Sequence, residues 1–356
     1  MKLAMLTDTH FGIRSDSLVF ANNQEKFYRE IFFPTLDKLQ IDTVLHLGDF
    51  WDNRKALTLV ALDRAQKYFF DELEKRGIVL YIIYGNHDVA NKNTNWPNSI
   101  DFLDRMYANI RVIQKPRVVT FDDLNIGFVP WVNKENLQES LDFISTADAK
   151  ILCGHFEIQS FEMTPGQKNE HGFEPSIFHR YDKVYSGHFH TMSTDGRIEY
   201  ISNTNQFNWS DYNLKKGFRI LDTATQGLEF VENPFNIYEK IIYQDDIDIL
   251  DFDYELYRDK IVRVYIQSFG TANQQKLNLF VERLSNLSYN VELLEVNETS
   301  YDGELTEDDL KDTDIDKVIG MYIDDVVQND MIDKGRLKGY FLELYNEALS
   351  ITDTEV

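Results

Sequence analysis

Histidine, aspartate and asparagine recur in five short polar turns within the first 190 residues of the chain. In chain order the turns contain Asp-Thr-His, Gly-Asp, Gly-Asn-His-Asp, Gly-His and Gly-His-Phe-His. They carry Asp8, His10, Asp49, Asn86, His87, Asp88, His155, His188 and His190. A lone histidine after a strand is more often structural than a ligand, but five of the eight histidines lie in these turns. Because such groups are costly to bury unpaired, a shared ligand is the better explanation.

Histidine together with aspartate and asparagine is a donor set for borderline transition metals such as Mn, Fe or Zn. With His87 and Asp88 set aside, seven donors remain, too many for one centre that keeps an open position. Two ions that share one carboxylate use the set well, and such a pair clamps the attacking and leaving oxygens of a phosphoryl displacement. The count favours a dinuclear phosphoesterase site. The spacing alone leaves open whether His188 and His190 bind one ion or two.

Each polar turn ends an apolar run, and near-continuous apolar runs of this length predict strands that are buried on both faces. The runs with their turns are 2–10, 43–50, 79–88, 150–157 and 183–190. Helical patterns at 22–40 and 58–77 separate the first three runs, which predicts right-handed crossovers and parallel pairing. Open α/β sheets place their ligands at the carboxyl ends of the strands, so the five turns are expected at one edge.

The rest of the chain predicts a second sheet and a smaller unit. Short runs with tight turns favour a second, largely antiparallel sheet. These runs are 117–121, 124–132, 197–202, 217–221 and 228–231. The expected fold is α/β, a two-sheet αββα sandwich. A boundary near 231–236 divides it from strands around a helix at 273–286, and helical patterns begin at 305. We therefore predict a catalytic domain (1–234), an α+β capping domain (235–300) and an acidic helical tail (301–356).

The five motifs, in this order, resemble the calcineurin-like metallophosphoesterase superfamily over roughly residues 1–205. The resemblance implies two divalent metal ions, most often Mn(II). Asp8, His10 and His190 would bind one ion, Asn86, His155 and His188 the other, and Asp49 would bridge them. A metal-bridging hydroxide would be the nucleophile. His87 would donate a proton to the leaving alkoxide, with Asp88 orienting it.

The order of domains resembles the SbcD-type subunits of recombination and repair nucleases, and among them those of T-even-type bacteriophages. That resemblance implies DNA exonuclease and endonuclease activity in recombination, repair and replication. It also implies a homodimer and a partner, an SbcC-like coiled-coil ATPase of the ABC type. The tail 301–356 would bind that ATPase or pack on the protein's own core. Apolar stripes in 56–70 and 99–107 would join the two copies, although packing on the sheet is their default role.

Two departures from the wider family concern substrate handling. Asp52 stands three residues after Asp49, where many relatives have a histidine implicated in exonuclease action. The segment 200–213 lacks the Pro-Gly-Ser turn common in relatives. Candidate phosphate contacts are Arg14, Arg54, Lys55 and Lys92, the last near Trp96 in the loop after Asp88.

Bulk composition limits the remaining choices. The net charge of −24 argues against nonspecific attraction to nucleic acid, yet residues 301–356 alone hold 16 acidic and 5 basic residues. The single Cys153 excludes an internal disulfide framework and fits a reducing compartment. With no signal peptide or membrane span in the sequence, we expect a cytoplasmic protein, in the host cytoplasm if phage-encoded. Alternatives are a phosphatase or cyclic-nucleotide phosphodiesterase on the same core, and a metal-free scaffold.

Overall fold

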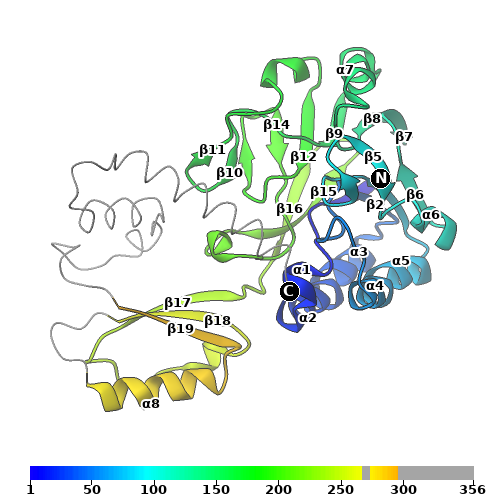
Figure 1. The fold of residues 1–356 in the computed structure, drawn as a ribbon. Helices are drawn as coiled ribbons and strands as arrows, with labels where there is room; N and C mark the ends of the chain where they lie inside the picture. The colour runs from blue at the N-terminus through cyan, green and yellow to red at the C-terminus, as the bar shows by residue number, and fades with distance from the viewer. Residues whose placement is uncertain (267–272, 296–356) are drawn as a thin grey trace, which may run out of the picture. The chain divides into compact units, whose positions relative to one another are not determined.

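The computed structural model describes residues 1–266 and 273–295 (Figure 1). The predicted helical tail, 301–356, lies outside the described residues. Contacts divide the chain into two compact units, and the larger one holds Met1–Ile241, Asp251–Arg263 and Leu279–Glu292. The other unit holds the remaining described segments.

The first six-stranded sheet has the order β16-β15-β1-β2-β3-β6. Its strands are β1 (Lys2–Leu6), β2 (Thr43–His46), β3 (Val79–Ile83), β6 (Ile110–Ile113), β15 (Lys216–Asp222) and β16 (Leu228–Asn233). Strands β1, β2, β3 and β6 are parallel, whereas β15 and β16 extend the sheet in antiparallel pairing. The predicted parallel pairing of the first three runs is confirmed.

The second six-stranded sheet has the order β13-β14-β12-β9-β8-β7. Its strands are β7 (Arg117–Phe121), β8 (Leu124–Val129), β9 (Ile151–His155), β12 (Lys183–Gly187), β13 (Ser193–Thr194) and β14 (Ile198–Tyr200). Only its outer pairs are antiparallel, since β8, β9, β12 and β14 run parallel. The prediction of a largely antiparallel sheet was wrong. The runs 217–221 and 228–231 belong instead to the first sheet, as β15 and β16.

The reason for the error lies in the connection between β9 and β12. It contains a small hairpin, β10 (Glu162–Thr164) with β11 (Gln167–Lys168), and a short 3-10 helix, η3 (Pro175–Phe178). A parallel crossover is usually recognised in the sequence because its connection contains a helix with helical periodicity. Helix α7 (Leu137–Thr146) provides that signal between β8 and β9. An irregular crossover has no such signal.

The two predicted helices are each built from two α-helices around a π turn. The first joins α2 (Leu18–Phe27), η1 (Tyr28–Phe32) and α3 (Phe33–Leu39), and the second joins α4 (Leu59–Ala65), η2 (Gln66–Phe70) and α5 (Asp71–Arg76). As predicted, the second begins after Thr58, whose Oγ1 accepts from Ala61 N, and stops at Gly77 with φ +67°. Pro34 lies in the first turn of α3, directly after the π turn.

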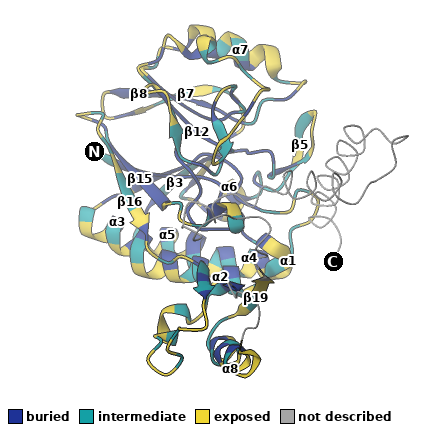
Figure 2. Ribbon diagram, turned by 90° about the vertical axis from the view of Figure 1, so that its left-hand side faces the viewer, coloured by how far each residue is buried: buried dark blue, intermediate teal, exposed yellow. Residues whose placement is uncertain are grey.

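The central strands β1 and β2 of the first sheet are buried on both faces, which explains their apolar runs (Figure 2). In β1, Ala4 and Leu6 pack with the aromatic residues of the helices, while Leu3 and Met5 pack with residues of the second sheet. A third cluster covers the outer face of the second sheet, beside α7. Helices, sheet, sheet and helix form the predicted αββα sandwich.

The later elements are also those expected. Strands β17 (Tyr238–Tyr243), β18 (Ile261–Ile266) and β19 (Asn290–Glu295) form a sheet in that order. Helix α8 (Gln274–Ser285) lies between β18 and β19 in the chain. The domain boundaries themselves stay a prediction. Among the described residues, no helix combines the length and apolarity that crossing a membrane requires.

Candidate metal centre

The strand ends bring the predicted donors together. Asp8 and His10 follow β1, Asp49 follows β2, and Asn86 follows β3 in the first sheet. His155 ends β9, and His188 and His190 follow β12 in the second sheet. Because these strands are parallel within each sheet, their carboxyl ends meet at one edge of the sandwich.

One donor cluster consists of Asp8, His10 and His190, whose donor atoms lie within 4.8 Å of one another. The Nε2 atoms of His10 and His190 are 3.2 Å apart, and His190 Nε2 is 3.8 Å from Asp8 Oδ1. Two imidazole nitrogens that face each other this closely need a shared proton or a cation between their lone pairs. Asp8 and His10 are buried, whereas the His190 side chain is 26% exposed.

The second donor cluster consists of Asp49, Asn86, His155 and His188. His155 Nε2 lies 3.3 Å from Asp49 Oδ2 and 3.1 Å from Asn86 Oδ1, and His188 Nδ1 lies 2.8 Å from Asn86 Oδ1. Asp49 Oδ2 is also 3.8 Å from His10 Nε2, so its carboxylate lies between the two clusters. Two nitrogen and oxygen clusters that share a carboxylate fit a pair of divalent transition-metal ions.

The electrostatics of the clusters favour cations. Burial opposes charge on His10, but Asp52 and Asp49 raise the pKa of its imidazole to about 9. Burial likewise opposes charge on His155, and Asp49 raises the pKa of its imidazole to about 9. Burial would raise the pKa of Asp49, yet the His155 charge lowers it well below its usual value. A buried carboxylate that stays ionised attracts positive charge, which is the requirement for holding metal ions.

Four of the donor residues adopt a left-handed backbone conformation that non-glycine residues rarely take. Their φ angles are +50° at Asp8, +45° at His10, +53° at Asp49 and +90° at His188. Each such residue costs about 1–3 kcal/mol and marks functional sites when the surroundings enforce it. Gly48 has φ +94°, and a Cβ there would lie 2.6 Å from His155 Nδ1, so this turn requires glycine.

His87 lies beside the clusters and is held by Asp52 rather than by Asp88. Its Nδ1 is 2.5 Å from the Asp52 carbonyl oxygen, so the ring donates there and leaves Nε2 as the second nitrogen. The buried Asp88 carboxylate instead accepts from the backbone N–H groups of Phe50, Trp51 and Gly85, at 3.0, 3.1 and 2.8 Å. The expectation that Asp88 orients the His87 ring is therefore corrected, because its carboxylate turns inward to bind two loops.

Asp52 also supports the first cluster, since its Oδ1 lies 3.3 Å from His10 Nδ1. A carboxylate against the outer nitrogen of a histidine fixes the ring orientation and keeps Nε2 directed at the cluster. In the sequence, Asp52 stands out only as a departure from relatives. In the structure this one residue positions both His10 and His87.

The sequence did not predict two aromatic residues, Phe207 and Trp131, whose rings pack against the histidines of the clusters and which we call the aromatic walls. The Phe207 ring packs edge-on against His10 and His190, with centroids 5.7 and 5.9 Å apart. The Trp131 ring lies 5.3 Å from His188 and 5.9 Å from His155. Each wall flanks one histidine pair, but an isolated aromatic residue in a loop gives no sequence signal of that placement.

The four candidate phosphate contacts are placed differently. Burial lowers the pKa of both His87 and His188, and the positive charge of Arg54 adds to that lowering. The exposed Arg14 donates from Nε and Nη2 to the Phe207 carbonyl oxygen, both at 3.4 Å. Lys55 and Lys92 are exposed, and in the described part of the chain neither side chain bonds to a donor residue. Of the four candidates, the half-buried Arg54 is the one whose charge acts on His87 and His188.

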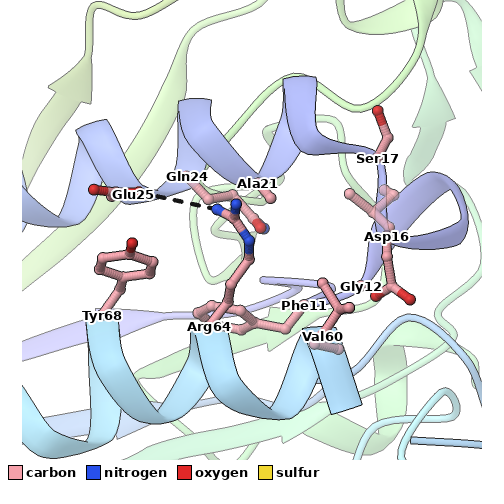
Figure 3. Close-up of a pocket in the computed structure, with 12 residues that line it drawn as sticks. Phe11, Gly12, Asp16, Ser17, Ala21, Gln24, Glu25, Val60, Arg64 and Tyr68 are labelled. Carbon is pink, nitrogen blue, oxygen red and sulfur yellow. Dashed lines mark ion pairs between the residues drawn. The ribbon is translucent and has the colours of Figure 1, made fainter. Parts of the chain in front are cut away.

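A separate hollow lies between α2 and α4 (Figure 3). Arg64 crosses it and pairs with Glu25 at 3.9 Å, while Phe11, Gly12 and Tyr68 contribute to its wall. None of the nine motif residues lines this hollow, so the chemistry belongs to the strand-end edge.

Comparison with known proteins identifies the family. The profile of the calcineurin-like phosphoesterases matches residues 1–192, which is more than half of the chain. The chain belongs to the calcineurin-like phosphoesterase family. Exonuclease subunit 1 of Enterobacteria phage T4 is 30% identical over 98% of this chain and 99% of its own length.

More distant relatives of this phosphoesterase also have names of nucleases or repair proteins. A subunit of the nuclease SbcCD from Staphylococcus epidermidis is 22% identical, over 81% of this chain and 80% of its own length. The DNA double-strand break repair protein Mre11 of Methanococcus maripaludis is 23% identical, over 90% of this chain and 94% of its own length. With its donor clusters, this phosphoesterase is a metal-dependent phosphodiesterase.

Proposed function

We propose that this phosphoesterase is a metal-dependent DNA nuclease, with exonuclease and endonuclease activity, that acts in recombination, repair and replication. The observation that carries the proposal is the pair of donor clusters sharing Asp49, with His87 beside them. The names of the relatives, an exonuclease subunit, a nuclease subunit and a break-repair protein, supply the substrate class. The proposed metal set is Asp8, His10 and His190, Asn86, His155 and His188, with Asp49 between them.

Two divalent ions, Mn(II) by preference, would supply Lewis-acid activation of water and neutralise charge on the phosphodiester. The protein's own residues do the rest. His87 is fixed through Nδ1 by the Asp52 carbonyl, so its Nε2 is left for the leaving oxygen. In the imidazolium form, with both nitrogens protonated, the ring would give the Nε2 proton to that oxygen and keep the Nδ1 proton. Arg54 is available to hold a phosphate beside it. Asp88 is a positioning residue, because it is buried and bonded to three backbone N–H groups.

The decisive experiment is manganese-dependent cleavage of linear duplex DNA by the wild type and by His87→Ser. We expect cleavage to fall by about 10²-fold or more, a magnitude typical of a lost general acid, with the metal content largely kept. His179→Ser is the matched control, because His179 is exposed and lies outside both clusters. Unchanged cleavage by His87→Ser would remove His87 from the mechanism. Rapid hydrolysis of phosphomonoesters without DNA cleavage would overturn the nuclease proposal.

We further propose that the nuclease works as a cytoplasmic subunit with an SbcC-like coiled-coil ATPase. The T4 and Staphylococcus relatives are named as subunits, which supports a partner. In this scheme 1–234 is the catalytic domain, 235–300 caps the DNA, and 301–356 binds the ATPase. Repeating the cleavage assay with and without the ATPase tests the partnership, since a true partner changes the rate or the product length.

A homodimer is part of the same proposal. In 56–70, Ala61, Ala65, Phe69 and Phe70 are buried against the sheet, whereas Leu59 is 84% exposed. Met106, at the end of α6 (Leu103–Met106), is 51% exposed. These residues leave apolar surface for a second copy. Light scattering at micromolar concentration should give a dimer mass for the wild type and a monomer mass for Leu59→Asp. A monomeric wild type would count strongly against the dimer.

A further inference from the structure

Lys216 is a buried lysine beside the metal centre that the mechanism does not use. Its side chain is 1% exposed, on β15. The Nζ atom donates to Asp211 Oδ1 at 2.6 Å, to Asn203 Oδ1 at 2.6 Å and to the His190 carbonyl oxygen at 2.8 Å. Lysine is almost never fully buried unless paired, and here all three of its donors are satisfied.

Through these bonds Lys216 joins the two sheets at the edge that carries the clusters. Lys216 begins β15 in the first sheet, whereas His190 belongs to the turn after β12 in the second. The Ser202 hydroxyl also donates to the His190 carbonyl oxygen, at 2.5 Å. The main chain of His190 is therefore held by a side chain of the first sheet as well as by the segment after β14.

Asp211, the partner of Lys216, holds the other side of the same histidine. It is 2% exposed, and its Oδ2 accepts from Phe207 N at 2.7 Å. The Phe207 ring packs against His190 and His10. The ion pair thus fixes both the main chain of His190 and the aromatic wall against its imidazole.

We propose that the Lys216–Asp211 pair is a positioning pair that sets the His190 imidazole in the cluster of Asp8, His10 and His190. This inference rests on the proposed function, in which that cluster binds a metal ion. A buried ion pair is weak evidence for stability, because apolar residues of similar volume often serve the fold equally well. What the pair supplies here is a defined position for one ligand.

The competing explanation is that the pair only holds the two sheets together. Another ion pair on the same strand, with a buried arginine and a half-buried glutamate, separates the two explanations. Arg219 of β15 is 6% exposed and pairs with Glu199 of β14 at 3.1 Å, so it also joins the sheets. Neither residue contacts a metal-cluster side chain among the described residues, which makes Arg219→Met the matched control.

The experiment measures Mn²⁺ binding by calorimetric titration, together with urea denaturation, for the full chain. Because loss of outer-shell support typically weakens metal binding about 10–100-fold, Lys216→Met should weaken one of the two sites by about that factor and leave the other unchanged. The weakened site should be the one that His190→Ala removes. Arg219→Met should lose comparable stability and still bind two ions with wild-type affinity.

Lys216→Met leaves the Asp211 carboxylate buried without its partner and by that alone lowers stability. The double variant Asp211→Asn, Lys216→Met removes both charges, and we expect it to regain stability without regaining the weakened site. Wild-type affinity at both sites in the double variant would overturn the inference, as would equal weakening by Arg219→Met. A wild type that binds no Mn²⁺ would instead overturn the proposed function.

Discussion

At the scale of single residues, the two histidines of Gly-His-Phe-His serve different donor clusters although one residue separates them. His188 Nδ1 lies 2.8 Å from Asn86 Oδ1, and His190 Nε2 lies 3.2 Å from His10 Nε2. The left-handed backbone at His188, with φ +90°, is part of the turn that sends the two rings apart. The buried Phe189 ring between them stacks on Tyr200, at 4.6 Å, which anchors the turn in the core.

That separation predicts different metal losses for two neighbouring substitutions. We expect His188→Ala to empty preferentially the site of Asp49, Asn86 and His155, and His190→Ala the site of Asp8 and His10. The reason is that each ring reaches donor atoms of one cluster only. Electron paramagnetic resonance of bound Mn²⁺ checks this, because each variant should retain one ion and lose the coupling between two. Loss of both ions in either variant would show that the clusters bind as one unit.

The residues of the two donor clusters were predictable from the sequence, whereas the residues that support them were not. Asp8, Asp49 and His155 were found because a donor type after an apolar run has a local signal. Asp52 Oδ1 lies 3.3 Å from His10 Nδ1. The Phe207 ring centroid lies 5.9 Å from that of His190, and Lys216 Nζ lies 2.8 Å from the His190 carbonyl oxygen. Those contacts join residues that are far apart in the chain, and no periodicity in the sequence predicts them.

At the scale of elements, Asp88 ties together the ends of two strands. Its carboxylate accepts from Phe50 and Trp51, in the turn after β2, and from Gly85, in the turn after β3. Asp49 of the first turn in turn accepts from His87 N at 2.7 Å. The two turns that carry the shared carboxylate and His87 are thus held by reciprocal side-chain to backbone bonds.

This arrangement predicts that Asp88→Ala costs stability more than chemistry. Three buried N–H groups would lose their acceptor, at about 1–3 kcal/mol each, so we expect a loss of at least about 3 kcal/mol in the free energy of unfolding. Asp88→Asn should cost less, because its amide oxygen still accepts from Phe50 and Trp51. Urea denaturation of both variants measures the difference. A stability of Asp88→Ala within about 1 kcal/mol of wild type would be incompatible with these bonds.

Element type was predictable, but strand direction in the second sheet was not. The five strands with polar ends and both long helices are present because burial on two faces and helical spacing have strong local patterns. The direction of β14 relative to β12 is set by a short irregular connection that contains β13 and a turn at Gly196. The sequence of a short strand is compatible with either direction, so the crossover decides it.

At the scale of the whole molecule, the two sheets meet at a cluster of buried carboxylates and histidines. Burial raises the pKa of the Asp8 carboxyl to about 6, and the charge of Asp49 contributes to that rise. Burial and the charge of Asp49 also raise the pKa of the Asp88 carboxyl, to about 7. Carboxylates concentrated at the joint between two layers destabilise the fold unless positive charge compensates them. Metal ions held by side chains from both sheets would supply that charge and join the layers.

Because the donor residues come from both sheets, we expect removal of the metal ions to lower the stability of the whole predicted catalytic domain. A ligand bound only by the folded state at about 1,000 times its dissociation constant adds about 4 kcal/mol to the free energy of unfolding. For a domain of this size that corresponds to a fall in Tm on the order of 10 °C when a chelator strips the ions. Differential scanning calorimetry with Mn²⁺ and with chelator measures it, and His87→Ser, which keeps every ligand, should show the full shift. His190→Ala should show a smaller shift, because one cluster no longer bridges the sheets. Identical Tm values for the wild type with and without ions would mean that the sheets are held together without the metal centre.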